Sequence, residues 1–144
     1  MIDQYIIKEL HSKQEMLDQL PLIEQLTATI TGESYSEMLV DMLAHGYRQV
    51  GVFDGDKCIG LSGFWITTKI YSGKYVELDN VVIDKEYRSK GIGKLLCDWV
   101  LMEAKTKGCK TAMLDAYLEN EAAHRFYERE GFYKRGYHFL YKII

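Results

Sequence analysis

The chain has 144 residues and a formal net charge of −3, with 47% hydrophobic and 27% charged residues. These values are typical of a globular domain that buries a core unaided, and they predict a single domain over residues 1–144. No basic run is present, which argues against nucleic-acid binding, and the N-terminus has no apolar stretch long enough for a signal peptide or a membrane span.

The three cysteines are Cys58, Cys97 and Cys109. Their number is odd, their spacing is wide and they contain no CxxC pair, which argues against a zinc site or a disulfide framework. We therefore expect reduced core thiols, no metal and a cytoplasmic location.

The first part of the chain is expected to form one strand and two helices. Tyr5–Leu10 has the pattern of a short strand, and Ser12–Glu15 matches a capping box at the start of a helix. Pro21 is a candidate kink within that helix. A second capping box, Ser34–Glu37, predicts another helix, with Gly46 as its stop.

The middle of the chain changes to a period of two and to continuous apolar runs. Three strands are predicted, over Gln49–Asp54, Lys57–Lys69 and Tyr75–Ile83. The Asp-Gly pair between the first two is typical of a hairpin turn, and Tyr71–Lys74 forms the next turn. These strands are expected to make an antiparallel sheet.

A helix, a strand and a second helix follow. Apolar residues at helical spacing predict a helix that begins at Ile92 and ends at Lys107–Gly108. Cys109–Ala116 is predicted to be the fifth strand. Asn120 is the expected N-cap of a helix that ends before Gly131, and the aromatic and β-branched stretch Phe132–Ile144 is predicted to form one or two strands.

The stretch RSKGIG, Arg88–Gly93, joins a predicted strand to a predicted helix. The amide protons at a helix start and the helix dipole bind anions, and glycines without a Cβ let a diphosphate approach the backbone. A solvated surface turn is the alternative. Side chains that can add donors are Arg88, Ser89, Lys90 and Lys94.

Two other phosphate loops do not fit this stretch. A Walker A loop requires Ser or Thr after Gly93-Lys94, where Leu95 stands. A dinucleotide fingerprint requires a small residue where Leu96 stands. A nucleotide-binding protein is therefore disfavoured.

Two motifs resemble those of the GNAT superfamily of N-acetyltransferases. VVIDKEYRSKGIGKLL resembles the pyrophosphate-binding motif, and YLENEAAHRFYEREGF, Tyr117–Phe132, is similar to the second motif. The resemblance implies an α/β fold with a mixed, mostly antiparallel sheet flanked by helices. In that fold the fourth and fifth strands splay apart and acetyl-CoA, the co-substrate, enters the opening.

The resemblance also implies which residues bind acetyl-CoA. Backbone groups of Val81, Val82 and Ile83 would pair with the pantetheine arm, and Asn120 would contact the pantetheine or phosphate region. The diphosphate would be held by the loop residues Arg88, Ser89, Lys90, Gly91, Ile92, Gly93 and Lys94. For Asn120 the alternative is a simple helix cap.

The same resemblance assigns two catalytic roles. Tyr127 would reach the sulfur of CoA as general acid, with helix packing as the alternative. A base must deprotonate the amine, because an alkylammonium has a pKa of about 10.4. Glu77 is slightly favoured as that base, with Asp79 and Asp115 as alternatives. Glu77 and Asp79 should project from one face, sharing strand parity with Ile83, unless a bulge intervenes.

The expected enzyme transfers the acetyl group of acetyl-CoA to a primary amine, of a small molecule or of a protein, by direct attack in a ternary complex. The alternative is a non-catalytic acyl-CoA-binding sensor or interaction module of the same fold. The acceptor and the oligomeric state are open from the sequence, and the habit of the family favours a homodimer.

Overall fold

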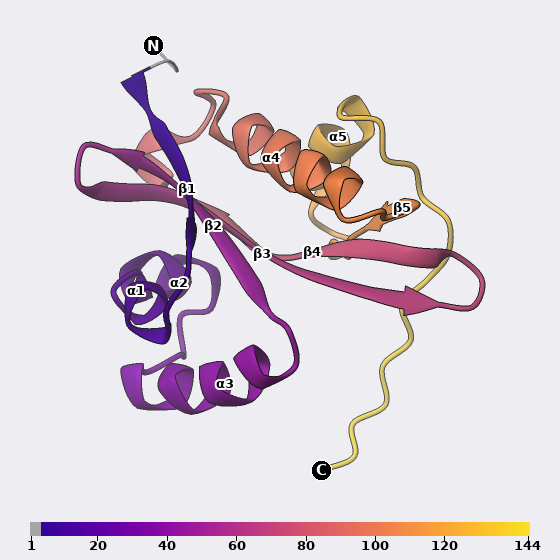
Figure 1. The fold of residues 1–144 in the computed structure, drawn as a ribbon, viewed down its shortest axis with the longest axis horizontal. Helices are drawn as coiled ribbons and strands as arrows, with labels where there is room; N and C mark the ends of the chain where they lie inside the picture. Colours follow the sequence, from indigo (N-terminus) through magenta and orange to yellow (C-terminus); the bar gives the residue numbers. More distant parts are fainter. Residues whose placement is uncertain (1–3) are drawn as a thin grey trace.

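A five-stranded sheet in the order β1-β2-β3-β4-β5 forms the centre of the fold (Figure 1). The computed structural model describes residues 4–144 of the chain. Neighbouring strands are antiparallel from β1 to β4, and β5 runs parallel to β4, which confirms the predicted mixed, mostly antiparallel sheet. The strands are β1 (Ile6–Leu10), β2 (Arg48–Asp54), β3 (Lys57–Lys69), β4 (Gly73–Ile83) and β5 (Thr111–Met113).

Helices cover both faces of this sheet, and each face buries its own apolar cluster. The helices are α1 (Lys13–Leu17), α2 (Leu20–Leu26), α3 (Gly32–Ala44), α4 (Ile92–Thr106) and α5 (Glu121–Arg129), with a short 3-10 turn η2 (Lys85–Tyr87). The first core contains Met16 and Leu39 from α1 and α3, and the second contains Leu96 and Val100 from α4. Figure 1 shows α1 to α3 on one side of the sheet and α4 on the other. Among the described residues, no helix has the length and hydrophobicity needed to cross a bilayer.

The N-terminal helices begin differently from the prediction. The predicted N-cap is confirmed, because Ser12 Oγ accepts from the Glu15 amide at 3.0 Å, but the Glu15 carboxylate accepts from the amide of His11 at 3.2 Å instead of that of Ser12. Pro21 does not kink one long helix; it lies in the first turn of a separate helix, α2, where a missing amide proton costs no hydrogen bond. The second box is formed by Thr31 and Ser34, so the helix N-cap lies three residues before the predicted one and the Ser34–Glu37 box was wrong.

The predicted strand Cys109–Ala116 is reduced to the three residues of β5. Its ladder ends where β4 and β5 separate, because a strand persists only while a neighbour satisfies its backbone groups.

The predicted strands in Phe132–Ile144 are wrong. This stretch has no helix or strand in the structure, although its composition is typical of a strand. The reason is the same as for the ends of β5: among residues 4–144, no strand lies beside residues 133–144. Figure 1 shows the segment running from α5 past β5 and away from the sheet to the C-terminus.

Candidate active site

The strands β4 and β5 form a wedge. They pair only through Tyr75–Glu77 on β4 and Thr111–Met113 on β5, so Glu77 lies at the point where the strands diverge. Beyond it, Leu78–Ile83 keep antiparallel pairs with β3 but have no strand partner toward β5 in the described part of the chain. One edge of β4 therefore has backbone groups free to bind an extended ligand, which confirms the predicted splay.

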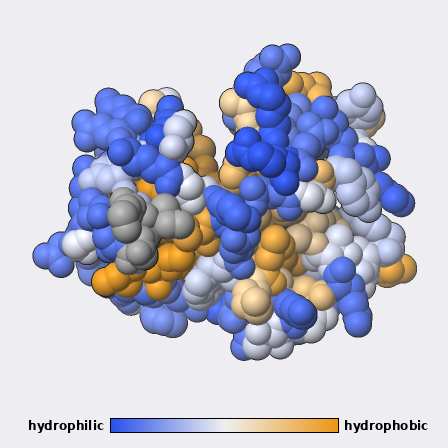
Figure 2. Space-filling model, turned by 90° about the horizontal axis from the view of Figure 1, so that it is seen from above, coloured by the Kyte–Doolittle hydropathy of each residue, from blue (hydrophilic) through white to orange (hydrophobic). Residues whose placement is uncertain are grey.

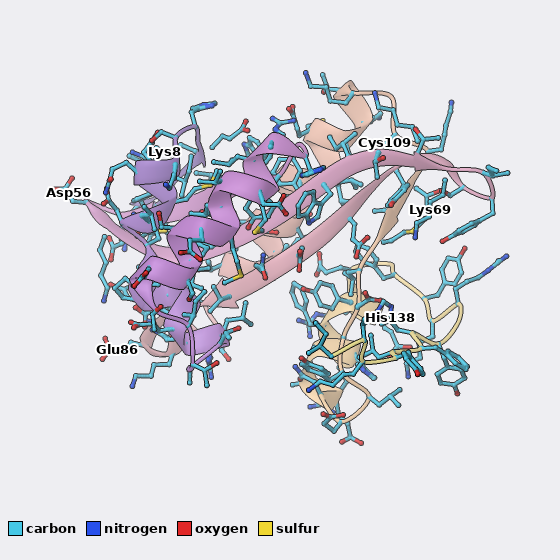
Figure 3. All side chains as sticks on the ribbon, turned by 90° about the horizontal axis from the view of Figure 1, so that it is seen from below. Lys8, Asp56, Lys69, Glu86, Cys109 and His138 are labelled. Carbon is cyan, nitrogen blue, oxygen red and sulfur yellow. The ribbon has the colours of Figure 1, made fainter. Side chains whose placement is uncertain are left out.

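The surface is hollowed between the β4–α4 connection and α5. Figure 2 shows a deep notch at the top of that view, with hydrophobic atoms on its walls. In Figure 3, Glu86 on the connection and His138 beside α5 lie on the two sides of an opening at the same place. The notch thus extends the wedge to the molecular surface.

The predicted anion loop lies on this connection and leads into α4. Gly91 is the N-cap of α4, with a φ of 83° that favours glycine, and no side chain caps the helix. Ser89 also has a positive φ, of 63°, and Arg88, Ser89 and Lys90 are exposed. The first amides of α4 therefore point outward without a side-chain partner, which is the geometry of an anion site.

Two residues of the loop have contacts with α5. A Cβ at Gly93 would lie 3.1 Å from Cζ of Phe126, so a glycine there allows α4 and α5 to approach closely. The ammonium of Lys94 lies 3.2 Å from a carboxylate oxygen of Glu130 and 3.4 Å from one of Asp98. These contacts place α5 beside the start of α4, which sequence spacing did not predict.

Tyr127 and Asn120 both belong to the second sequence motif, Tyr117–Phe132, which contains α5. The ring of Tyr127 packs against Phe126 and Phe132, with centroids 5.0 and 5.6 Å apart, and burial raises the pKa of its hydroxyl to about 12. The phenol therefore keeps its proton at neutral pH. Asn120 Oδ1 accepts from the amide of Ala123 at 3.1 Å, so this side chain caps α5 as expected.

The three candidate bases differ in their surroundings. Burial raises the pKa of Glu77, and the negative charges of Asp115 and Asp79 raise it further. Asp79 Oδ2 accepts from the indole of Trp65 at 3.0 Å. Asp115 Oδ2 lies 3.5 Å from Nδ1 of His138, and its side chain is 60% exposed. Glu77 is thus the member of this acidic group whose pKa burial and neighbouring charge raise together.

A bulge in β4 decides which face these carboxylates occupy. Asn80 has a φ of 57°, and the pairing with β3 shifts between Leu61 and Gly63. Before the bulge Leu78 packs in the core under α4, whereas after it Val82 packs in the core under α1 to α3. Glu77 and Asp79 share one face as predicted, but the bulge places that face on the side of Val82 and opposite to Ile83.

The residues that hold this bulge were missed by the sequence analysis. Asn80 Nδ2 donates to Tyr47 Oη at 3.3 Å, and the buried Gln49 Nε2 donates to Tyr47 Oη at 3.1 Å and Tyr35 Oη at 3.3 Å. Tyr47 also packs on Trp65, at a centroid distance of 5.0 Å. The available signal was the asparagine itself, which is depleted in strands and tolerates a positive φ.

The described residues contain no group of three or more His, Cys, Asp and Glu side chains placed to hold a metal ion.

Comparisons with known proteins agree with this geometry. Residues 15–132 match the acetyltransferase (GNAT) family model. The chain is 27% identical over 135 residues to the "uncharacterized N-acetyltransferase YhdJ" of Bacillus subtilis, covering 92% of this chain and 95% of that protein. It is 31% identical over 121 residues to N-alpha-acetyltransferase 30 of Schizosaccharomyces pombe, covering 80% of this chain and 79% of that protein.

The fold is shared with a solved structure that contains CoA. Aminoglycoside N-acetyltransferase AAC(6')-Iy in complex with CoA superposes with a TM-score of 0.84 at 19% identity, over 96% of this chain and 93% of that one. This chain thus shares its fold with a protein whose structure was solved with CoA bound. The chain is a member of the acetyltransferase (GNAT) family and is an N-acetyltransferase.

Proposed function

We propose that this enzyme transfers the acetyl group of acetyl-CoA to a primary amine by direct attack in a ternary complex, with Glu77 as the base. The observation that carries the proposal is the position of Glu77, at the point where β4 and β5 diverge. Its pKa is raised in the direction of neutral pH, and a carboxylate with a higher pKa accepts a proton from an ammonium group more readily. Asp79 is a weaker candidate because its Oδ2 already accepts a hydrogen bond from the indole of Trp65.

The open edge of β4 fits the extended arm of acetyl-CoA. The thioester of acetyl-CoA supplies the carbonyl that the amine attacks. The free backbone groups around Val81, Val82 and Ile83 would pair with the amides of the arm as a strand would. The amides at the start of α4, from Gly91 onward, would bind the diphosphate, with Arg88 and Lys90 as exposed cations beside them.

Tyr127 supplies a proton donor on the α5 side of the wedge. Its hydroxyl stays protonated at neutral pH because burial raises its pKa to about 12. A protonated phenol can donate to the departing thiolate as the acetyl group leaves. Asn120 caps the start of α5. A contact between Asn120 and the pantetheine would be an additional role of this residue.

The acidic surroundings of Glu77 support a cationic acceptor. The carboxylates of Asp79 and Asp115 are close enough to raise its pKa, so their negative charges add at the same place. A negative field attracts an ammonium group before it loses its proton. Whether that ammonium belongs to a small molecule or to a protein is decided by the acceptor assay below.

The test is release of free CoA thiol from acetyl-CoA with a panel of primary amines. The expected result is release that requires an added amine and falls about 10²-fold or more in Glu77→Gln. Asp79→Asn serves as the matched control on the same face of β4. Equal activity of Glu77→Gln and wild type would remove Glu77 as the base. If CoA raises the melting temperature and no amine in the panel supports turnover, the proposed transfer to a primary amine is wrong.

We further propose a cytoplasmic location and a homodimer. The free thiols of Cys58 and Cys97, both buried, support a reducing compartment. Imaging of a tagged chain in its native cell tests the first proposal, and sedimentation of the purified protein tests the second.

A further inference from the structure

The short turn η2, which leads into the anion loop, is bonded to the tip of the β2–β3 hairpin. The hydroxyl of Tyr87, the last residue of η2, donates to Oδ2 of Asp54 at 3.0 Å. The ammonium of Lys57 lies 3.4 Å from Oδ2 of Asp84 and 5.2 Å from the centroid of the Tyr87 ring. Asp54 and Lys57 face each other across the hairpin turn. Figure 1 shows this hairpin and the connection from β4 to α4 at the same end of the sheet.

The first half of the anion loop has no side-chain partner of its own. Arg88, Ser89 and Lys90 are exposed, and their side chains form no hydrogen bond or ion pair with residues 4–144. Ser89 also has a φ of 63°, a conformation that costs energy for a residue with a side chain. The conformation of this half therefore depends on how the two ends of the loop are held.

The two ends are held by different forces. Ile92, at the α4 end, is 1% exposed, and a Cβ at Gly60 would lie 2.7 Å from its Cγ2, so the helix start packs directly on β3. The end at η2 is held by polar contacts instead. Tyr87 is only half-buried, and besides its bond to the hairpin the amide of Lys85 donates to Oε1 of Gln25 at 3.0 Å. Loss of one hydrogen bond therefore affects the η2 end more than the α4 end.

We propose that Asp54 and Tyr87 are positioning residues for the diphosphate of acetyl-CoA. Their hydrogen bond holds the residue before Arg88, so that the loop stays in the conformation that binds the anion. They act through the loop and not on the diphosphate itself. If fewer free molecules have this conformation, the measured Kd rises in proportion. The inference rests on the proposed binding of the diphosphate by this loop, and it adds a hairpin to the acetyl-CoA site.

The first test is isothermal titration calorimetry of CoA binding to the full chain, which requires no amine acceptor. Tyr87→Phe removes the hydroxyl and keeps the ring beside Lys57, and Asp54→Ala removes the acceptor. Each change should raise the Kd for CoA about three- to tenfold, as expected for the loss of one hydrogen bond. Because both changes remove the same bond, the double variant should bind CoA about as well as each single variant. A Kd within about twofold of the wild-type value in both single variants overturns the proposal.

A conservative change at Asp54 and a matched change at a neighbouring tyrosine are the controls. Asp54→Asn keeps an oxygen acceptor for the hydroxyl of Tyr87 and should recover most of the affinity lost in Asp54→Ala. The ring of Tyr5 packs edge-on against that of Tyr87, at a centroid distance of 6.5 Å, and its hydroxyl has no hydrogen bond to residues 4–144. Tyr5→Phe should therefore leave the Kd for CoA unchanged.

A variant that weakens the fold elsewhere separates positioning from stability. Arg48 pairs with Glu9 on β1 and with Glu103 near the other end of α4. Arg48→Met should lower the melting temperature and leave the Kd for CoA unchanged. A Kd that rises in step with the loss of melting temperature through the whole set of variants overturns a positioning role.

Gly91→Ala separates this inference from the loop assignment on which it rests. A side chain at a φ of 83° should weaken CoA binding if the loop holds the diphosphate. Weaker binding in Gly91→Ala with unchanged binding in Tyr87→Phe and Asp54→Ala refutes the positioning role and keeps the loop as the diphosphate site. Unchanged binding in all three refutes the loop assignment, and the inference with it. Neither result bears on Glu77 as the base, because no turnover is measured.

Discussion

The hydroxyl of Tyr47 is the centre of a buried network that holds the β4 bulge, and removing it tests how the wedge is maintained. Tyr47 is 3% exposed and Gln49 is fully buried. In Tyr47→Phe the ring that packs on Trp65 remains, but Asn80 Nδ2 loses its acceptor. Leaving such a group unpaired costs about 1–3 kcal/mol, and we expect the free energy of unfolding to fall by that amount.

Tyr35→Phe is the matched control. It removes the weaker acceptor of Gln49 Nε2, at 3.3 Å, while the bond to Tyr47 at 3.1 Å persists. Gln49 Nε2 and Asn80 Nδ2 each keep Tyr47 Oη as an acceptor, so the loss should be about 1 kcal/mol or less. Urea titration measures both variants, and an effect of Tyr47→Phe no larger than that of Tyr35→Phe would refute this account of the network.

Two substitutions at Asn80 distinguish the effect of the backbone conformation in the bulge from the effect of the side-chain hydrogen bond. Asn80→Gly loses the amide donor but accepts the φ of 57°, whereas Asn80→Ala loses the donor and is strained as well. The difference between them should be roughly 1–2 kcal/mol. Because the bulge adjoins the open edge of β4, Tyr47→Phe and Asn80→Ala should also raise the KM for acetyl-CoA, and Tyr35→Phe should leave it unchanged.

Three further predictions concern charge and the anion loop. Asp115→Asn removes a charge that raises the pKa of Glu77, so the acidic limb of the pH profile of kcat/KM should move to lower pH; an unchanged limb would contradict Glu77 as the base. Gly91→Ala places a side chain at a φ of 83°, and it should raise the KM for acetyl-CoA with little effect on the KM for the amine. Arg48 donates to Glu9 at 2.7 and 2.8 Å and lowers the pKa of that carboxyl. The pair therefore stabilises the fold at any pH above the pKa that Glu9 has in the unfolded chain. This stabilisation is lost as the pH falls through the lower pKa that Glu9 has in the folded chain. Arg48→Met should therefore destabilise by about 2 kcal/mol at neutral pH and by less in acid, as measured by urea titration at both pH values.

Much of the fold and part of the site could be predicted from local sequence. Helices with strong periodicity, such as α4, and hairpins with an Asp-Gly turn form through contacts between residues near in sequence. The glycine turn that starts α4 was predicted in the same way, because a glycine at a helix start can be recognised from neighbouring residues alone. Asn120 as the cap of α5 belongs to this group as well.

The predictions that failed depend instead on contacts between residues that are far apart in the sequence. The length of β5 depends on where β4 turns away from it, and the loss of strands after Phe132 depends on whether an edge is available. The faces of Glu77 and Ile83 depend on a bulge whose side-chain partner, Tyr47, is 33 residues away in sequence. None of these features can be predicted from the local sequence at the position where it occurs.

Local propensities and the two motifs thus determined the order of elements, the family and the position of the glycine loop before α4, because each is encoded within a few consecutive residues. The tertiary structure alone decided where the two central strands separate, which carboxylate lies at that point and whether the last segment has a partner. Strand pairing and the charge around a carboxylate join residues distant in the chain, and their energies exist only once those residues meet.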